Sequence, residues 1–335
     1  MKAPGKIQIT VWLLGLAGAA LFTGLLIHQG VGQVLDAFAT GEWAIMGIVV
    51  YHLIPIFLDA LAWWVLFPNP DRPPMLRLFW MRWIGESVST LVPSAAVGGD
   101  IVRARLAAIR GVPLPIAAGT VLVDLTLGIF IQAGFTLLGL VLLADLTGKT
   151  SFVRPTLIGI VIALFAFAGF YFVQRMGMFR FIGRIVSRLA GSSDWQSLVQ
   201  GGDTLDRTIR SLYARRRGVV GCCAWTIGSL VIGSGEIWLA LWILDLPDSF
   251  LNALILQSMV LTIRSAAFPV PAGLGVQEGG YLVVGNLLGI PGEGAFALAL
   301  VARAREIGLG IPGLISWQLI EARRFLRARA AATVR

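Results

Sequence analysis

The chain has 335 residues, of which 57% are hydrophobic and 13% are charged, and its mean hydropathy is +0.82. A soluble domain of this length has too little interior to bury that much apolar surface, so the composition excludes a soluble globular protein and predicts one embedded in lipid. The formal net charge of +9 does not indicate a nucleic-acid partner, because the arginines lie in short loops between long apolar runs, where they determine membrane topology.

Six apolar segments have the length that a helix needs to cross a bilayer, about 20 residues. They lie near 7–28, 43–67, 115–144, 155–174, 218–244 and 294–320. The segment at 7–28 shows no small-residue cleavage site before His28, so we expect a retained helix rather than a signal peptide. The only cysteines, Cys222 and Cys223, are adjacent in an apolar run and predict neither a disulfide nor a metal site.

Two further apolar stretches, 76–110 and 250–289, are interrupted in the middle by proline and glycine. The interrupting residues are Pro93, Gly98 and Gly99 in the first stretch and Pro269, Pro271, Gly273 and Gly275 in the second. Such breaks leave backbone groups without hydrogen bonds, which hydrocarbon does not tolerate, so protein or a wet cavity must surround them. We predict that each stretch is a re-entrant hairpin of two half-helices.

The distribution of basic residues agrees with this topology. If each hairpin returns to the side from which it entered, the six spans place the arginine-rich loops and both termini in the cytoplasm. The first hairpin then enters from the cytoplasm and the second from outside, which is typical of an inverted repeat. The sequence therefore predicts an all-α polytopic membrane protein in which residues 1–335 form one transmembrane domain. Within it, residues 177–217 are expected to form an amphipathic segment on the inner membrane surface, where their arginines attract anionic lipids.

Ionisable residues inside the apolar segments are the strongest functional signal, because one unpaired charge at the bilayer centre costs about 2.5–3.5 kcal/mol. The residues that we expect to line a site are Glu86, Asp100, Arg103, Asp124, Arg264, Glu278, Arg303, Arg305 and Glu306. Arg303 and Glu306 are three residues apart on one helix and should pair, and the polar stripe that contains Asp124 is suited to face them. These charges either form ion pairs that only hold the bundle together, for instance Asp124 with Arg303, or line a substrate or ion pathway.

The glycines at the two breaks leave the backbone open to a ligand. Without a Cβ they let N–H groups approach a ligand, and half-helices that begin near Asp100 and Val276 direct their positive ends at it. With Arg264 nearby, this arrangement fits an anionic headgroup. Arg103 is equally consistent with an ordinary cytoplasmic charge.

The sequence contains no recognisable catalytic constellation. Its two histidines, His28 and His52, are too few for a histidine-based phosphatase or a histidine-rich metal site, and no DxxD metal motif occurs. No Ser–His–Asp group occurs in an expected context. We therefore expect no enzyme activity, no metal and no cofactor, with catalysis by membrane-embedded carboxylates as the alternative.

The two hairpin sequences resemble a known family. Residues 82–103, RWIGESVSTLVPSAAVGGDIVR, and 268–280, FPVPAGLGVQEGG, are similar to the flippase-like transmembrane region of lysylphosphatidylglycerol synthases and its stand-alone relatives. Within that family, residues 123–127, 297–306 and 310–314 resemble the hopanoid-associated membrane proteins of the HpnL type. The resemblance implies an inner-membrane protein that moves a lipid, in that subgroup one linked to hopanoids. Because the sequence ends about fifteen residues after the last predicted span, we expect no lysine transfer to phosphatidylglycerol.

Together these features favour a lipid flippase or transporter of the bacterial inner membrane, with membrane lipids as its partners. Its expected substrate is a polar or anionic lipid, with a hopanoid among the candidates. Two alternatives stay open: a non-transporting scaffold for lipid-biosynthetic enzymes, and a membrane-embedded lipid transferase. The glycine-rich helices permit an oligomer without requiring one.

Overall fold

The computed structural model describes residues 42–92, 98–148, 153–176, 195–267, 270 and 273–333. Several predicted features lie outside these residues: the first span at 7–28, the arginine-rich start of the amphipathic segment at 177–194, and Pro93, Pro269 and Pro271. Within the described ranges every regular element is helical and there is no strand. The predicted all-α class is therefore confirmed for this part of the chain.

The helices follow the predicted segments closely. In chain order they are α3 (Glu42–Tyr51), α4 (Leu53–Trp64), α5 (Met75–Leu91), α6 (Gly98–Ile109), α7 (Leu114–Thr147), α8 (Val153–Met176), α10 (Trp195–Ala214), α11 (Arg216–Ile243), α12 (Phe250–Ala266), α13 (Val276–Leu287) and α14 (Gly292–Thr333). α6 and α13 begin where the sequence predicts the second half-helices of the two hairpins. α14 runs past its predicted end near 320, because residues 321–333, EARRFLRARAAAT, consist mostly of strong helix formers.

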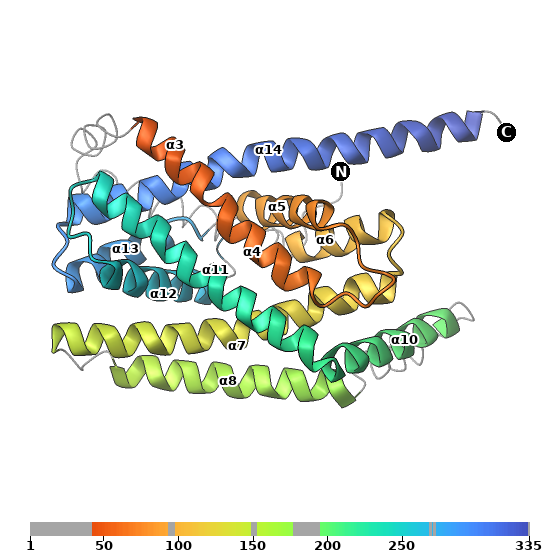
Figure 1. Ribbon diagram of the computed structural model, residues 1–335, viewed down its shortest axis with the longest axis horizontal. Coiled ribbons are helices and arrows are strands. Elements are labelled where there is room, and N and C mark those ends of the chain that lie inside the picture. The colour runs from red at the N-terminus through yellow and green to blue at the C-terminus, as the bar shows by residue number, and fades with distance from the viewer. Residues whose placement is uncertain are drawn as a thin grey trace, which may run out of the picture.

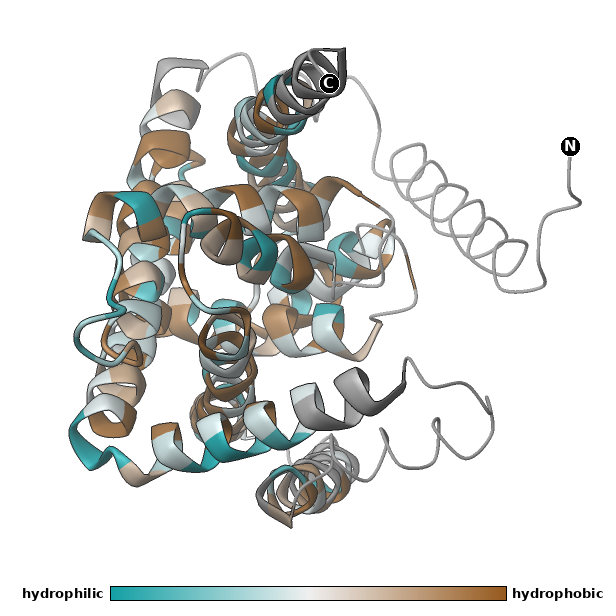
Figure 2. Cartoon of the chain, turned by 90° about the vertical axis from the view of Figure 1, so that its right-hand side faces the viewer, coloured by the Kyte–Doolittle hydropathy of each residue, from teal (hydrophilic) through white to brown (hydrophobic). Residues whose placement is uncertain are grey.

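Three helical stretches among the described residues are long and apolar enough to cross a membrane: Met46–Trp64 in α3 and α4, α7, and α11. In the most apolar 18-residue part of each stretch, only 28–33% is buried inside the protein. The rest of their apolar surface, including Val141 and Trp242, each 64% exposed, needs a lipid environment. Figure 2 shows hydrophobic residues along most of the bundle, whereas hydrophilic residues gather at the turn from α10 to α11.

The two interrupted stretches form two helical pairs. α5 packs against α6, and α12 packs against α13; in Figure 1 the first pair lies to the right and the second to the left. One hydrophobic core surrounds Trp63 and Leu106 at the first pair, and another surrounds Leu241 and Leu256 at the second. α14 contacts both α5 and α13, and α7 contacts both α6 and α12. These two long helices therefore bridge the pairs, while α4 packs against α5 and α11 against α12, and α4 and α11 run side by side (Figure 1).

Glycine permits the close approach of α6 to α5. Gly99 lies against α5, where a Cβ would overlap the carbonyl oxygen of Gly85 and the hydroxyl of Ser89. α7 and α12 approach each other in the same way at Gly139, where a Cβ would overlap Ser258. Small residues let the backbones of membrane helices come together, so Gly99 has a packing role in addition to the ligand access predicted for it.

We predict that Gly99→Ala forces α6 away from α5 and lowers the free energy of unfolding by about 1–3 kcal/mol, as is typical of overpacked sites. The measurement is thermal unfolding of the purified protein in detergent, followed by tryptophan fluorescence. Gly134→Ala in α7 is the matched control, because a Cβ there meets nothing within 4 Å and alanine favours the helix. Unchanged or higher stability of Gly99→Ala would contradict this packing.

Candidate functional site

Ion pairs between helices concentrate at the centre of the bundle, in two clusters with a histidine between them. The Asp124 cluster consists of Asp59, Arg82, Asp100, Arg103 and Asp124. The Glu306 cluster consists of Arg264, Glu278, Arg303, Arg305 and Glu306. The histidine is His52, which contacts Glu86 and Glu236.

The Asp124 cluster ties the first helical pair to α4 and α7. One oxygen of Asp124, Oδ2, accepts from Arg103 Nη1 at 2.6 Å and from Arg82 Nη1 at 3.0 Å. The other arm of Arg82 donates from Nη2 to Asp59 Oδ2 at 3.0 Å. Arg103 donates from Nε and Nη2 to Asp100 Oδ1, at 2.9 and 2.8 Å. Each guanidinium therefore spans two carboxylates, which uses the forked donor geometry of arginine.

The Glu306 cluster ties the second helical pair to α14. Glu306 accepts from Arg264 Nη1 at Oε1, at 2.5 Å, and from Arg303 Nη1 at Oε2, at 2.7 Å. Arg303 also donates from Nε to Glu278 Oε1 at 2.6 Å, and Glu278 is completely buried. Arg305 Nη2 lies 3.6 Å from Glu306 Oε1. The cluster thus joins α12, α13 and α14 through charge-assisted bonds.

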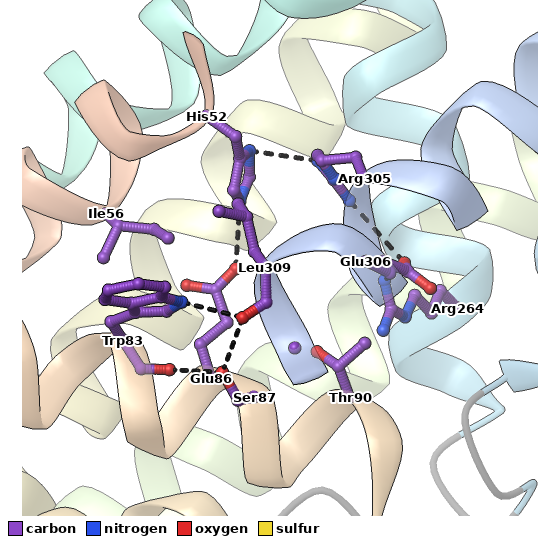
Figure 3. A pocket seen from close by; sticks show the side chains of 11 residues that line it. His52, Ile56, Trp83, Glu86, Ser87, Thr90, Arg264, Arg305, Glu306 and Leu309 are labelled. Carbon is purple, nitrogen blue, oxygen red and sulfur yellow. Dashed lines mark hydrogen bonds and ion pairs between the residues drawn. The ribbon is translucent and has the colours of Figure 1, made fainter. Parts of the chain in front are cut away.

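His52 lies at the junction of α3 and α4, with a carboxylate on each side of its ring, and Figure 3 shows the one from Glu86. Its Nδ1 is 2.6 Å from Glu236 Oε2 on α11, and its Nε2 is 2.9 Å from Glu86 Oε1 on α5. Glu236 also accepts from Arg305 Nη1, at 2.9 Å for Oε1 and 3.1 Å for Oε2. A continuous chain of contacts therefore runs from Glu86 through the imidazole to α14.

The charges at the centre are unequal in number. Among the described residues, these ion pairs join seven carboxylates to five guanidinium groups and one imidazole. Every one of these arginines is bound to at least one carboxylate, so none presents a free guanidinium for an anion. Carboxylate is therefore in excess at the centre even when the imidazole is protonated.

A cavity of about 440 Å³ opens beside the Asp124 cluster, a size in the range of small-ligand sites, about 300–1,000 Å³. Its walls come from α4, α5, α6, α7, α11 and α12 and mix charged with apolar and small polar groups. The charged and histidine side chains that line it are His52, Asp59, Arg82, Glu86, Asp100, Arg103 and Asp124. Leu125, Gly128 and Ile129 of α7 contribute part of the less polar wall.

A second cavity, of about 40 Å³, lies beside the Glu306 cluster and is lined partly by Arg264, Arg305 and Glu306 (Figure 3). This volume is enough for water, which polar walls of this kind hold readily. His52, Ile56 and Glu86 line both cavities. The imidazole and its carboxylate therefore stand between the two spaces.

The structure brings most of the predicted site residues together. Glu86, Asp100, Arg103 and Asp124 line the larger cavity, Glu86, Arg264, Arg305 and Glu306 line the smaller one, and Glu278 and Arg303 stand behind it in the Glu306 cluster. The predicted pair of Arg303 with Glu306 is confirmed. The suggested pair of Asp124 with Arg303 is wrong, because α6 packs beside α7 and supplies Arg103 to Asp124. The alternative for Arg103, an ordinary cytoplasmic charge, does not fit a residue that is only 3% exposed and bound to Asp100 and Asp124.

The glycines at the breaks have conformational and packing roles. Gly98 and Gly99 begin α6, and Gly99 fits against α5 as described above. Gly273 and Gly275 adopt φ values of +57° and +75° just before α13, a backbone region that glycine occupies without strain. A Cβ on Gly273 would lie 3.3 Å from Arg264 Cγ, so this turn packs against the Arg264 side chain. Ligand access at these four glycines stays a prediction.

Four residues of the site are not among those predicted to line it: His52, Asp59, Arg82 and Glu236. Three of them carried the signal used for the others, an ionisable group inside an apolar segment, but had no recognisable partner in sequence. Arg82 counts in the sequence only as a cytoplasmic charge of the stretch 72–82 and as the first residue of the hairpin motif. Arg82 lies four residues before Glu86 on one helix, and this spacing indicates that both side chains face the same space.

The fold and the charged centre define the class: a helical membrane protein with a polar cavity between two helical pairs. The chain belongs to the family described as lysylphosphatidylglycerol synthase TM region, whose model matches residues 12–313. A UPF0104 membrane protein of Methanothermobacter thermautotrophicus (strain Delta H) is 25% identical to it over 321 residues, which covers 90% of this chain and 91% of that relative. No solved structure matches the chain. The family predicted from the hairpin sequences is thus confirmed.

We predict that Asp124→Asn destabilises the protein by about 3 kcal/mol, because it leaves Arg82 and Arg103 facing each other without the central negative charge. Glu321→Gln is the control, since its partner Arg105 has a side chain that is 58% exposed and such pairs contribute at most about 1 kcal/mol. Thermal unfolding in detergent compares the two variants. Equal stability of both would show that the Asp124 cluster contributes no more than a surface pair.

Proposed function

We propose that the protein moves a polar lipid across the membrane, with the headgroup passing through the larger cavity while the hydrocarbon tails stay in the bilayer. The observation that carries this proposal is the cavity of about 440 Å³ lined by the Asp124 cluster. Charged groups inside a membrane protein are costly, and they are retained where a polar substrate or ion must pass. The family is named after the transmembrane region of a lipid-modifying enzyme, and this name supports a lipid as the substrate.

The proposed mechanism uses the two helical pairs as re-entrant hairpins that enter from opposite sides, with six spans around them and both termini in the cytoplasm. The order of elements supports it, because each pair is followed directly by a long helix, α7 after the first and α14 after the second. Transporters with inverted repeats place their sites where such discontinuous helices meet. Rocking of one pair against the other would then expose the cavity to each side in turn.

The ion pairs determine which kind of headgroup the larger cavity can bind. The arginines that an anionic headgroup would use are already bound to carboxylates, so an anion must first displace a carboxylate from Arg82, Arg103 or Arg264. A neutral polar headgroup, rich in hydroxyl groups, binds to the same walls without breaking an ion pair. We therefore propose a polar lipid as the substrate, with an anionic lipid second. The HpnL-type resemblance makes a hopanoid the first lipid to test.

The proposal is tested by narrowing the cavity without disturbing an ion pair. Gly128 lines the larger cavity, and a Cβ there meets nothing within 4 Å, so Gly128→Leu projects its side chain into the open space. We predict that it slows lipid movement in proteoliposomes at least about tenfold, because the headgroup path is filled. Labelled hopanoid and phosphatidylglycerol are followed by their accessibility to a membrane-impermeant quencher.

Gly134→Leu is the matched control, because it lies on the same helix with equal space around it and does not line the cavity. Its rate should stay within about twofold of the wild type. Absence of lipid movement in folded wild-type protein would overturn the proposal in favour of a scaffold. A new lipid product in the same vesicles would instead identify a transferase.

A further inference from the structure

Both ring nitrogens of His52 face carboxylate oxygens, and this fixes how many protons the group holds. A neutral imidazole has one N–H donor and one lone pair, so it satisfies only one of the two carboxylates. The contacts of 2.6 Å to Glu236 and 2.9 Å to Glu86 both have hydrogen-bond lengths. Both contacts are hydrogen bonds only when two protons lie among His52, Glu86 and Glu236, which is one more than neutral imidazole carries beside two ionised carboxylates.

The surroundings of His52 supply charges of both signs. Glu86 faces it from α5 and Glu236 from α11, while Arg305 of α14 places Nη1 3.1 Å from Nδ1. Glu306 and Arg264 stand one contact further away, beyond Arg305. Arg305 donates to both oxygens of Glu236 and holds that carboxylate in place. The Nδ1 side of the ring is therefore fixed and closely surrounded.

The Nε2 side of the ring is the more accessible one. The side chain of Glu86 is 35% exposed, whereas that of Glu236 is 6% exposed. Glu86 lines both cavities, and Glu236 is not among the lining residues of either. Glu86, the partner of Nε2, is therefore open to both cavities, whereas Glu236, the partner of Nδ1, lies away from them.

We propose that His52, Glu86 and Glu236 form a proton-binding site that controls the separation of the two cavities. With the additional proton bound, Nε2–H donates to Glu86 across the distance of 2.9 Å and holds α5 against α4. When Nε2 gives this proton to cavity water, its lone pair faces a carboxylate oxygen at 2.9 Å, and the two acceptors repel. Glu86 then leaves the ring, and the partition formed by His52, Ile56 and Glu86 opens.

The chain makes this site measurable because it contains only two histidines. In a His28→Gln background purified without a histidine tag, ring-labelled histidine gives nuclear magnetic resonance signals from His52 alone. We predict that both ring nitrogens carry protons at pH 7 and that Glu86→Gln leaves only one protonated. Removing that carboxylate should weaken proton binding by the ring at least about tenfold, since a neighbouring negative charge stabilises imidazolium.

Glu321→Gln is the control, because it removes a carboxylate from an exposed pair with Arg105. It should leave the signals of His52 unchanged. If Glu86→Gln does not fold, Glu236→Gln tests the same expectation, because it removes the other carboxylate that faces the ring and should also weaken proton binding. A ring that is singly protonated at pH 7 in the parent protein, or one that titrates identically with and without Glu86, overturns the proposal.

The control of lipid movement by this proton rests on the proposed function and has its own test. In proteoliposomes, the rate for wild-type protein should change between pH 7 and pH 10, and the ratio of rates at these two pH values should approach one in Glu86→Gln. A wild-type rate that does not depend on pH overturns the gating of the cavities. If no lipid moves at any pH, the proposed function fails, and the resonance experiment still decides whether the proton-binding site exists.

Discussion

The structure depends on the neutralisation of charges that lie inside an apolar bundle. An unpaired charge at membrane depth costs about 2.5–3.5 kcal/mol, so the central arginines require carboxylates within hydrogen-bond distance. Asp124 meets this need for two helices at once, because one oxygen binds both Arg82 and Arg103. The first helical pair can therefore occupy only a position that brings these two arginines to α7. Glu306 plays the corresponding part for α12 and α14.

This pairing shapes what the larger cavity can bind. A guanidinium that already spans two carboxylates offers little to an incoming anion, although the number of arginines in the sequence suggests an anion site. What the cavity presents is a set of carboxylates, hydroxyls and amides beside an apolar wall. Such a surface suits an amphipathic molecule whose polar part exchanges water for hydrogen bonds with the protein.

His52 has a different role from the arginines, because its charge can change under physiological conditions. Arginine stays charged, so the two clusters are permanent connections between helices. The contact between α4 and α5 through His52 and Glu86 depends on a proton. It is also located where the two cavities meet. The centre of the bundle thus combines permanent ion pairs with one contact that the loss of a proton can break.

The sequence alone determined the membrane class, the positions of most of the described helices, the starts of α6 and α13, and the pair of Arg303 with Glu306. These features depend on composition, on proline and glycine breaks, or on neighbours within one helix turn, all of which are local. Only the tertiary structure decided that Asp124 binds Arg82 and Arg103, that Gly99 fits against Gly85, and that His52 lies between two carboxylates. Those contacts join residues on different helices, and which helices meet is set by packing and charge neutralisation of the whole bundle rather than by spacing along the chain.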